Sequence, residues 1–560
     1  MSSKLILSSL VLAAFLQPAT QFAQKVPGPR PPVEKDDDMA TIREPGKTHD
    51  AMYYDFLDNT FAQAPRNYFR RLSRREPAWN VNAWDEVPDS SWFTNCNHLH
   101  PLTPEQIYRG AAEQSGPDLS APLVVLEGKT AGISLGFGRT RDARGNIYFI
   151  KFDPSDCAEM STAAEVIGSR LFYAMGFNVP AESIVYLRAD QIAVDPAARI
   201  WDETGRQRKM SQADVERVLA GAARMPDGRY RAVTSLLIQG KIKGPFKFYG
   251  TREDDPNDLI PHEYRRELRG LRLLSAWLSH FDIRAGNTLD TYVEEGGRKF
   301  LRHYLLDFGA TLGSASRYPK SPRVGFAYAF DPVEMAGPLF TLGLYQPVWR
   351  KHPSEIKYTS IGRFESSHFS PADWKPLYPI ASFDFMDGAD AVWAAKIVMS
   401  FTEGQIRAAV HAGQLSDPEA EDYLVRTLIE RQRKIGRFAF SRVNPLDQFN
   451  ISGAGESARL EFQDLAARYG FAEPPAARYC YALSRLGEQG GSDPTDCASK
   501  TAVPLGGLLQ WAHRTGSFGS LFVLTMHTRR AESGFADKSL KVYLEMKDSG
   551  FEVKGWEREA

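Results

Sequence analysis

The chain has 560 residues, of which 43% are hydrophobic and 24% charged, values that are ordinary for a folded soluble protein. Its formal net charge of −1 gives no support for a nucleic-acid partner or for a surface that binds anionic membranes. At roughly 150 residues per domain, this length predicts about two to four domains.

The first segment, residues 1–23, has the pattern of a secretory signal peptide. Lys4 precedes an apolar run from Leu5 to Leu16, and these 12 residues are too few to span a bilayer. We therefore expect an exported protein, periplasmic or extracellular, with cleavage after Ala23 and no stable membrane span. An uncleaved anchor and a buried N-terminal helix are the alternatives that this pattern leaves open.

Residues 24–119 are interpreted as an N-terminal extension and linker. The stretch KVPGPRPPVEKDDD is rich in proline and charge, which predicts a linker without a core of its own. The extension ends in the aromatic and acidic stretch WDEVPDSSWFTN, which gives no further indication of its fold.

Residues 120–250 have a strand-rich pattern. Short runs rich in valine, isoleucine, phenylalanine and tyrosine, separated by turns, predict strands over 121–128, 131–138, 146–152, 182–187 and 230–240. One helix is predicted over 161–177, because its apolar residues recur at helical spacing and Gly176 is placed to end it.

Residues 251–447 have a helical pattern instead. A helix with a broad apolar face is predicted within 261–280, and more helices over about 390–440. One of the latter opens with a capping box of Ser416 and Glu419. The first helix carries four arginines, for which we expect a solvated face paired with Glu263 and Glu267; an anchor for acidic groups is the alternative. These are Arg265, Arg266, Arg269 and Arg272.

Residues 448–560 return to strands, which predicts a small β-rich C-terminal domain. A strand is expected over 520–530, and a hairpin over 538–556 that turns at Asp548-Ser549-Gly550. Cys480 and Cys497 bracket a glycine-rich loop, and the sequence leaves open whether they form a disulfide or remain buried thiols.

Three polar residues in the helical region suggest ion chemistry. The stretch HFDIRAGN places Asp282 five residues before Asn287, and an apolar strand then delivers Asp307 into a Phe-Gly turn. Asn287 and Asp307 can offer oxygen ligands to a hard cation such as Mg²⁺ bound to phosphates. Asp282 would orient or deprotonate an attacking hydroxyl group.

The strand-rich region offers a cation for the same chemistry. Lys151 ends a predicted strand, and Glu165 on the following helix can hold it as a fixed charge for nucleotide phosphates, although Glu159 is an alternative partner. The hairpin before that strand contains three glycines whose bare backbone could close over phosphates. They are Gly132, Gly136 and Gly138.

In order and spacing these residues resemble the protein-kinase-like fold, especially its atypical HipA-like, CotH-like and secretory-pathway branches. The motifs are Lys151, Glu165, His280-x-Asp282-x4-Asn287 and Asp307-Phe308-Gly309. The resemblance covers roughly residues 120–445. It implies an α+β fold with a two-lobed kinase-like core, made of a strand-rich N-lobe over 120–250 and a helical C-lobe over 251–447.

The resemblance also implies a role for each residue. Lys151 would contact ATP phosphates, Glu165 would position Lys151, and Asp282 would be the catalytic base. Asn287 and Asp307 would hold Mg²⁺ or Mn²⁺. The implied reaction moves the γ-phosphoryl group to a hydroxyl of a protein or small molecule. An inactive pseudokinase that acts as a binding module, and AMP transfer on the same fold, are the alternatives.

Three other catalytic or binding motifs are excluded by the residues or predicted elements that surround them. Gly132 to Gly136 fits the G-x-S-x-G nucleophile elbow around Ser134, but it leads into turns and another strand instead of a helix. The GKT stretch at 128–130 lacks the first glycine of a phosphate-binding loop. The HEYRR stretch at 262–266 lacks the second histidine of a zinc-binding helix.

Overall fold

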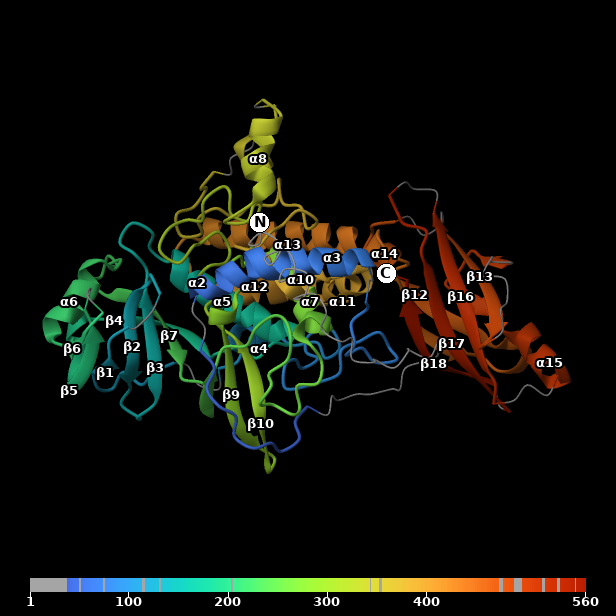
Figure 1. The fold of residues 1–560 in the computed structure, drawn as a ribbon, viewed down its shortest axis with the longest axis horizontal. Helices are drawn as coiled ribbons and strands as arrows, with labels where there is room; N and C mark the ends of the chain where they lie inside the picture. The colour runs from blue at the N-terminus through green and yellow to red at the C-terminus, as the bar shows by residue number, and fades with distance from the viewer. Residues whose placement is uncertain are drawn as a thin grey trace, which may run out of the picture.

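The computed structural model describes most of the chain after the predicted linker, in thirteen stretches. These are residues 38–49, 52–73, 76–112, 116–129, 132–202, 205–342, 344–351, 355–472, 477–487, 496–515, 519–530, 534–548 and 550–559. The predicted signal peptide, residues 1–23, lies outside them. The fold is mixed α/β, with one large mixed sheet and further β-rich sheets. Figure 1 shows the large sheet at one end, helices in the middle and the C-terminal sheets at the other end.

The large sheet has seven strands in the order β4-β7-β3-β2-β1-β5-β6. Their bounds are β1 Leu123–Glu127, β2 Leu135–Arg141, β3 Ile147–Phe152, β4 Glu182–Leu187, β5 Ile192–Trp201, β6 Gln207–Lys209 and β7 Tyr230–Leu236. Neighbouring strands are antiparallel except β1 and β5, which run parallel. The strands predicted over 121–128, 146–152, 182–187 and 230–240 are confirmed, whereas β2 starts four residues later than expected.

Helix α5 (Met160–Met175) packs against this sheet and is buried almost all round, as expected of a helix inside a core. Its N-terminus is capped by the residue that follows β3, because the backbone N–H groups of Ser161 and Thr162 donate to Asp153 Oδ1 at 2.8 and 2.9 Å. Gly176 ends the helix with φ +110, as the sequence predicted. Helix α6 (Gln212–Ala220) lies beside β5.

The middle of the molecule is helical. It comprises α4 Pro104–Arg109, α7 Arg266–Leu278, α8 Pro332–Phe340, α9 Val348–Lys351, α10 Ala381–Asp384, α11 Gly388–Ser400, α12 Glu403–His411 and α13 Pro418–Phe440. Helices α7, α11 and α13 pack on one another around fully buried side chains that include Trp277 and Trp393. A three-stranded sheet flanks them, formed by β8 Lys241–Gly244, β9 Thr288–Glu295 and β10 Arg298–Leu305.

Two expectations for these helices are wrong. The cap of α13 is Asp417, whose side chain accepts from the Glu419 N–H at 2.9 Å, and not Ser416. The arginines of α7 do not form a solvated face, because Arg265, Arg266 and Arg269 are at most 2% exposed. They point into the core because acidic partners from distant segments neutralise them there, such as Asp390 for Arg266 and Arg269.

The C-terminal region has two sheets with a hydrophobic core of their own. Their strands are β11 Leu446–Ser452, β12 Arg459–Asp464, β13 Ala477–Arg485, β14 Asp496–Ala498, β15 Ala502–Pro504, β16 Leu521–Arg530, β17 Ser539–Lys547 and β18 Gly550–Arg558. Two helices, α14 (Leu465–Arg468) and α15 (Gly506–Thr515), accompany them. The predicted hairpin of β17 and β18 is confirmed, although Ser549 in its turn lies outside the described residues.

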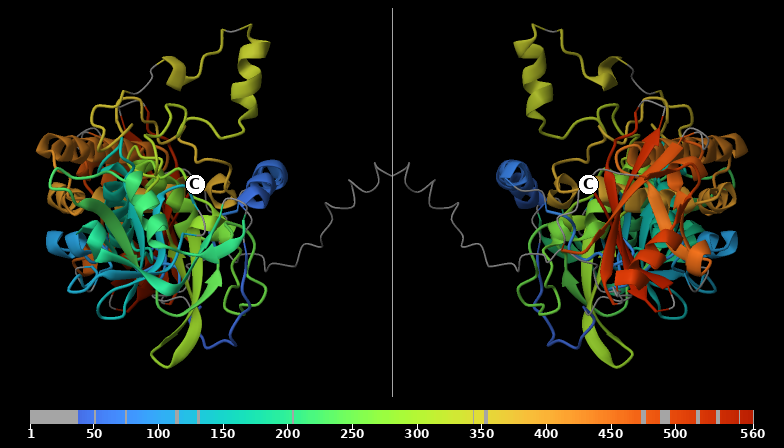
Figure 2. Two further views of the ribbon diagram at one scale, coloured as in Figure 1. Left: turned by 90° about the vertical axis from the view of Figure 1, so that its left-hand side faces the viewer. Right: turned by 90° about the vertical axis from the view of Figure 1, so that its right-hand side faces the viewer.

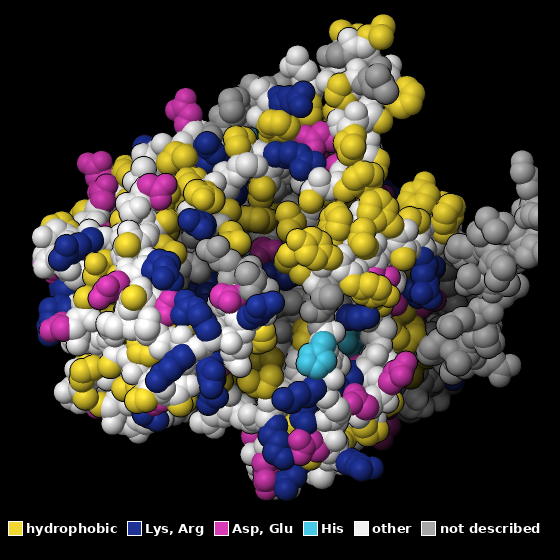
Figure 3. Space-filling model, turned by 60° about the vertical axis from the view of Figure 1, so that its left-hand side comes forward, with side chains coloured by type: hydrophobic (Ala, Val, Ile, Leu, Met, Phe, Trp, Pro, Cys, Tyr) yellow, Lys and Arg dark blue, Asp and Glu magenta, His cyan; other side chains and the backbone are white. Residues whose placement is uncertain are grey.

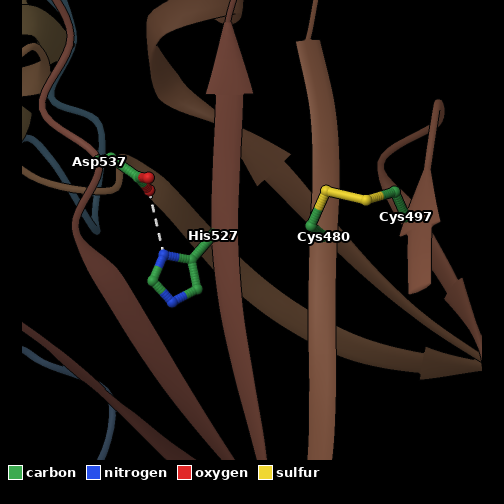
Figure 4. Close-up of a disulfide and its surroundings, with 4 residues drawn as sticks. All are labelled: Cys480, Cys497, His527 and Asp537. Atoms are coloured by element: carbon green, nitrogen blue, oxygen red, sulfur yellow. Dashed lines mark hydrogen bonds and ion pairs between the residues drawn. A yellow bond between two sulfur atoms is a disulfide. The ribbon is translucent and has the colours of Figure 1, made fainter. Parts of the chain in front are cut away.

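The two C-terminal cysteines are joined. Cys480 on β13 and Cys497 on β14 are direct cross-strand partners and form a disulfide (Figure 4). This settles the question that the sequence left open. Cys96 and Cys157 are free thiols.

The described part of the N-terminal segment packs against the helices and the C-terminal sheet. Asp85 accepts from Arg266 of α7 at 2.6 Å and from Arg558 of β18 at 2.7 Å, so one carboxylate joins the helices to the C-terminal sheet. Trp92 stacks on His303 of β10 with 3.5 Å between ring centroids. No local pattern in the sequence indicates these contacts.

Several large apolar side chains are exposed together in two of the described regions. The helical stretch of α2 (Met52–Leu57), the π-helix η1 (Asp58–Gln63) and α3 (Ala64–Ser73) exposes aromatic side chains such as Tyr53, Tyr54 and Phe69. Figure 2 shows α8 standing out from the body, and hydrophobic side chains gather below it in Figure 3. Among the described residues, no helix is both long enough and apolar enough to cross a membrane.

We expect Asp85→Asn to lower the free energy of unfolding by about 3 kcal/mol, because it leaves two buried guanidinium groups without their shared carboxylate. Asp85 has φ +58, and asparagine tolerates this left-handed conformation, so the substitution removes charge without new backbone strain. Chemical denaturation measures the effect. The control is Asp227→Asn, which breaks an exposed pair with Arg229 and should leave the transition unchanged. Equal transitions for both variants would contradict this role of Asp85.

The disulfide should stabilise the C-terminal sheets. Because it closes a loop with a sequence separation of 17, chain entropy predicts a contribution of about 3 kcal/mol. Reductant should therefore lower the melting temperature of the wild-type protein to that of the Cys480→Ser/Cys497→Ser double variant. The double variant itself should not respond to reductant, and an equal response of both proteins would show that the bridge contributes nothing.

Candidate functional site

The candidate site is centred on the ammonium group of Lys151. Tyr148, Ile150 and Phe152 of β3 are buried on one face of the sheet, so alternation turns Lys151 to the other face. There Lys151 Nζ lies 2.8 Å from Glu165 Oε2 on α5 and 2.9 Å from Asp307 Oδ1 after β10. The structure therefore brings together three of the residues predicted from the sequence.

Glu165 is the partner of Lys151, which resolves the choice that the sequence left open with Glu159. The carboxylate of Glu159 accepts from the backbone N–H of Ser416 at 3.0 Å instead. The side chain of Glu165 is 1% exposed, and its other oxygen, Oε1, accepts from the Phe308 N–H at 3.0 Å. Glu165 thus fixes both Lys151 and the turn that follows Asp307.

Close packing holds the Asp307-Phe308-Gly309 turn against α5. Phe308 is fully buried and stacks on Phe172, with ring centroids 5.1 Å apart. Gly168 makes this possible, because a Cβ at that position would lie 2.7 Å from Phe308 Cβ. Asp307 itself has φ +60, a left-handed conformation that is uncommon outside glycine and often found at functional sites.

The charges of the three groups are strongly coupled. Burial alone would lower the pKa of Lys151, but the carboxylates of Asp307 and Glu165 outweigh it and raise this pKa well above its usual value. Lys151 in turn lowers the pKa of Asp307, whereas burial raises that of Glu165. Lys151 is therefore a fixed cation at neutral pH, and Asp307, with 41% of its side chain exposed, is the accessible carboxylate.

Asp282 and Asn287 form a second cluster beside the first. Asn287 Nδ2 donates to Asp282 O at 2.7 Å and to Asp282 Oδ2 at 3.1 Å, and Arg284 Nε donates to Asp282 Oδ1 at 3.1 Å. The Leu306 N–H donates to Asn287 O at 2.9 Å, which places Asn287 next to the strand end that carries Asp307. Burial raises the pKa of Asp282, and the charge of Asp307 adds to this rise.

The oxygen donors fit a hard cation better than a soft one. The described residues contain no group of three or more His, Cys, Asp or Glu that could hold a metal on its own. The Asp307 carboxylate and the Asn287 amide oxygen are instead the sparse, oxygen-only donor set that Mg²⁺ uses when phosphates and water complete its shell.

The three glycines of the predicted phosphate-covering hairpin have different surroundings. Gly136 and Gly138 lie in β2, and a Cβ at Gly136 would lie 2.0 Å from the Ile150 carbonyl oxygen, while one at Gly138 would lie 2.8 Å from that of Gly128. Close strand packing therefore requires these two glycines. Gly132 precedes β2 with φ +81. A role of the three in covering phosphates stays a prediction.

Sequence reasoning missed Lys129. It lies between β1 and β2, and its Nζ donates to the Ser134 carbonyl at 2.7 Å and contacts Ser134 Oγ. In the sequence, this stretch matches only an incomplete phosphate-binding loop, GKT. The position of Lys129 becomes clear from the strand register of the structure, because Lys129 lies one residue beyond Gly128, which pairs with Phe137 of β2.

The rival motifs have structural surroundings of their own. Ser134 leads into β2 and not into a helix, so the strand-turn-helix context of a nucleophile elbow is missing. His262 lies in a short 3-10 helix (His262–Tyr264) and contacts Asp258 Oδ2 at 2.8 Å in the core.

Comparisons with known proteins give only distant likenesses. No family model matches the chain, and no curated protein does. A structure of the proinflammatory kinase CtkA of Helicobacter pylori matches with a TM-score of 0.28 and 12% identity, covering 57% of this chain and 94% of that one. A structure of the Golgi casein kinase matches with a TM-score of 0.28 and 10% identity, covering 73% and 94%. Both of these proteins are kinases.

The histidine of the HFDIRAGN stretch offers a test of this packing. His280 is fully buried between Phe172 and Phe308, and burial lowers its pKa to about 4. Between pH 6.5 and 4, His280 is protonated in the unfolded chain but stays neutral in the folded protein. The free energy of unfolding therefore falls as the pH drops from 6.5 towards 4. The total loss is about 3 kcal/mol.

We expect His280→Phe to remove this part of the pH dependence while keeping an aromatic ring in place. The measurement is the free energy of unfolding of both proteins at several pH values between 4 and 8. The difference between variant and wild type should grow in favour of the variant as the pH falls below 6.5. A difference that is constant with pH would show that His280 is not held neutral in the folded protein.

Proposed function

We propose that this protein is a kinase-like phosphotransferase that moves the γ-phosphoryl group of ATP to a hydroxyl group. The seven-stranded sheet with α5 would be the N-lobe, and the helices around α7 the C-lobe, of a two-lobed core. One observation carries the proposal: Lys151 of the sheet contacts both Glu165 of α5 and Asp307 after β10. This arrangement supplies a fixed cation and an accessible carboxylate at one point, as phosphoryl transfer requires.

Each residue has a task in this reaction. Lys151 binds phosphate oxygens, and Glu165 keeps its ammonium group aimed at them. Asn287 and Asp307 would hold Mg²⁺ or Mn²⁺, which neutralises phosphate charge when it is bound.

Asp282 accepts the proton of the attacking hydroxyl group, and its hydrogen bonds with Asn287 and Arg284 set the orientation of its carboxylate. Catalysis is then mainly positioning and electrostatic stabilisation.

The acceptor is a protein or small-molecule hydroxyl, and an exported location, periplasmic or extracellular, is part of the proposal. Two other functions use the same residues. A pseudokinase would bind nucleotide without transfer, and an AMP transferase would bind ATP in the reverse orientation. Buried support of Lys151 by Glu165 serves all three, so the experiment has to separate them.

The first test is thermal stabilisation of the full chain by ATP, with and without Mg²⁺ or Mn²⁺. Ligand at 100 times its Kd adds about 2.7 kcal/mol of stability, which shifts the melting temperature measurably. Asp307→Ala should abolish the metal-dependent part of the shift, whereas Asp190→Ala, at an exposed pair with Arg188 in the turn between β4 and β5, should keep it. A folded wild-type protein that no nucleotide stabilises would contradict the proposal.

The second test follows the label. With a candidate acceptor or the protein itself, transfer from ATP labelled at the γ-phosphate is expected, and Asp282→Asn should abolish transfer while retaining binding. Transfer only from ATP labelled at the α-phosphate would establish an AMP transferase. Binding without any transfer would support the pseudokinase.

A further inference from the structure

We propose that Lys129 is a second phosphate-binding lysine, which faces Lys151 across the glycine Gly136. This inference rests on the proposed function, because it names a further contact of the same nucleotide. It narrows the class of ligand to a nucleotide with at least two phosphates, which two ammonium groups would bind instead of one.

The strand register places the two lysines in one row across the sheet. Gly136 of β2 pairs directly with Lys151 of β3. On the other side of β2, Phe137 pairs with Gly128, so the same antiparallel register continues to Gly136 opposite Lys129. Directly opposite residues of antiparallel strands share a face, and each pair has Cα atoms about 5 Å apart. Lys129 and Lys151 therefore lie on one face with their Cα atoms about 10 Å apart.

The residue between them in this row is a glycine. Gly136 has no side chain, and the structure shows why it must not have one, because a Cβ there would lie 2.0 Å from the Ile150 carbonyl oxygen. Gly136 therefore places no side chain between the two lysines. Two flexible four-carbon side chains that flank a glycine on one face of a sheet can converge on one polyphosphate.

Lys129 is also free to change partners. Its ammonium group is held by two neutral acceptors, the carbonyl and hydroxyl oxygens of Ser134. Within the described parts of the chain, no carboxylate lies within ion-pair distance of it. Phosphate oxygens would replace the Ser134 contacts with charge-assisted hydrogen bonds, which are stronger.

The charges that act on Lys129 are consistent with a position beside Lys151. Burial and, after it, the charge of the neighbouring Lys151 lower the pKa of Lys129 to about 8, while Asp307 and Glu165 act in the opposite direction. Lys129 thus lies close enough to the three site residues to respond to each of their charges. A polyanion placed between the two lysines would remove their mutual repulsion.

The test is the affinity of the full chain for ATP, ADP and AMP, measured by titration calorimetry for the wild type, Lys129→Met and Lys129→Arg. We expect Lys129→Met to weaken ATP and ADP binding about tenfold and AMP binding much less, because the second lysine acts on the outer phosphates. Lys129→Arg should restore most of the affinity. The matched control is Lys209→Met, at an exposed position of the edge strand β6, which should bind like the wild type.

The outcomes separate this inference from the function on which it rests. If the folded wild-type protein binds none of the three nucleotides, the proposed function fails. If the wild type binds the nucleotides and Lys129→Met binds each of them as tightly as the wild type does, only the role of Lys129 fails. An equal loss for all three nucleotides would also overturn it, because Lys129 would then support the fold and not the phosphates.

One rival interpretation of the Lys129–Ser134 contact has its own signature. Lysine next to a serine hydroxyl is the arrangement of a nucleophile and its base. Labelling of Ser134 by a fluorophosphonate probe, located by mass spectrometry and lost in Lys129→Met, would overturn the phosphate-binding role. No labelling of Ser134, together with the selective loss of ATP and ADP affinity, is the result we expect.

Discussion

One ammonium group joins three distant parts of this chain. Lys151 lies 14 residues from Glu165 and 156 residues from Asp307 in the sequence, yet it contacts both within 3 Å. Without this cation, two carboxylates would face each other with little water between them, and their repulsion would separate α5 from the end of β10. The contact therefore fixes how the large sheet, its helix and the three-stranded sheet meet. The same contact defines the candidate site, so here the requirement of folding and the requirement of function coincide.

Apolar packing makes that meeting point rigid. Phe308 enters the core beside Phe172, which holds the left-handed backbone of Asp307 in place and leaves its carboxylate partly exposed. The N-terminal segment adds further support. Asp85 forms ion pairs with both α7 and β18, and Trp92 stacks on His303 of β10. A site that depends on positioned charges needs such a frame, because water that penetrated a looser one would screen the charges.

Local patterns in the sequence predicted much of this fold, and long-range contacts supplied the rest. A run rich in valine, isoleucine, phenylalanine and tyrosine predicted β3 with Lys151 near its end, and helical spacing predicted α5 and hence Glu165. The burial of the arginines of α7 was missed, because Asp85 is 181 residues away from Arg266 and no local pattern connects them. The cap of α5 by Asp153 was missed for a related reason, since Asp153 directly follows β3 and lies eight residues before Ser161. Lys129 was missed because its importance depends on strand register, which the sequence does not fix. The predicted domain boundaries and the roles of the site residues stay predictions.

The most direct test of the central claim is a crystal structure of the full chain with a non-hydrolysable ATP analogue and Mn²⁺, whose anomalous signal locates the metal. The account predicts Mn²⁺ between the Asn287 amide oxygen and the Asp307 carboxylate, with phosphate oxygens on Lys151. A nucleotide bound elsewhere, or bound here with Lys151 still paired to Asp307 and no metal between Asn287 and Asp307, would contradict it.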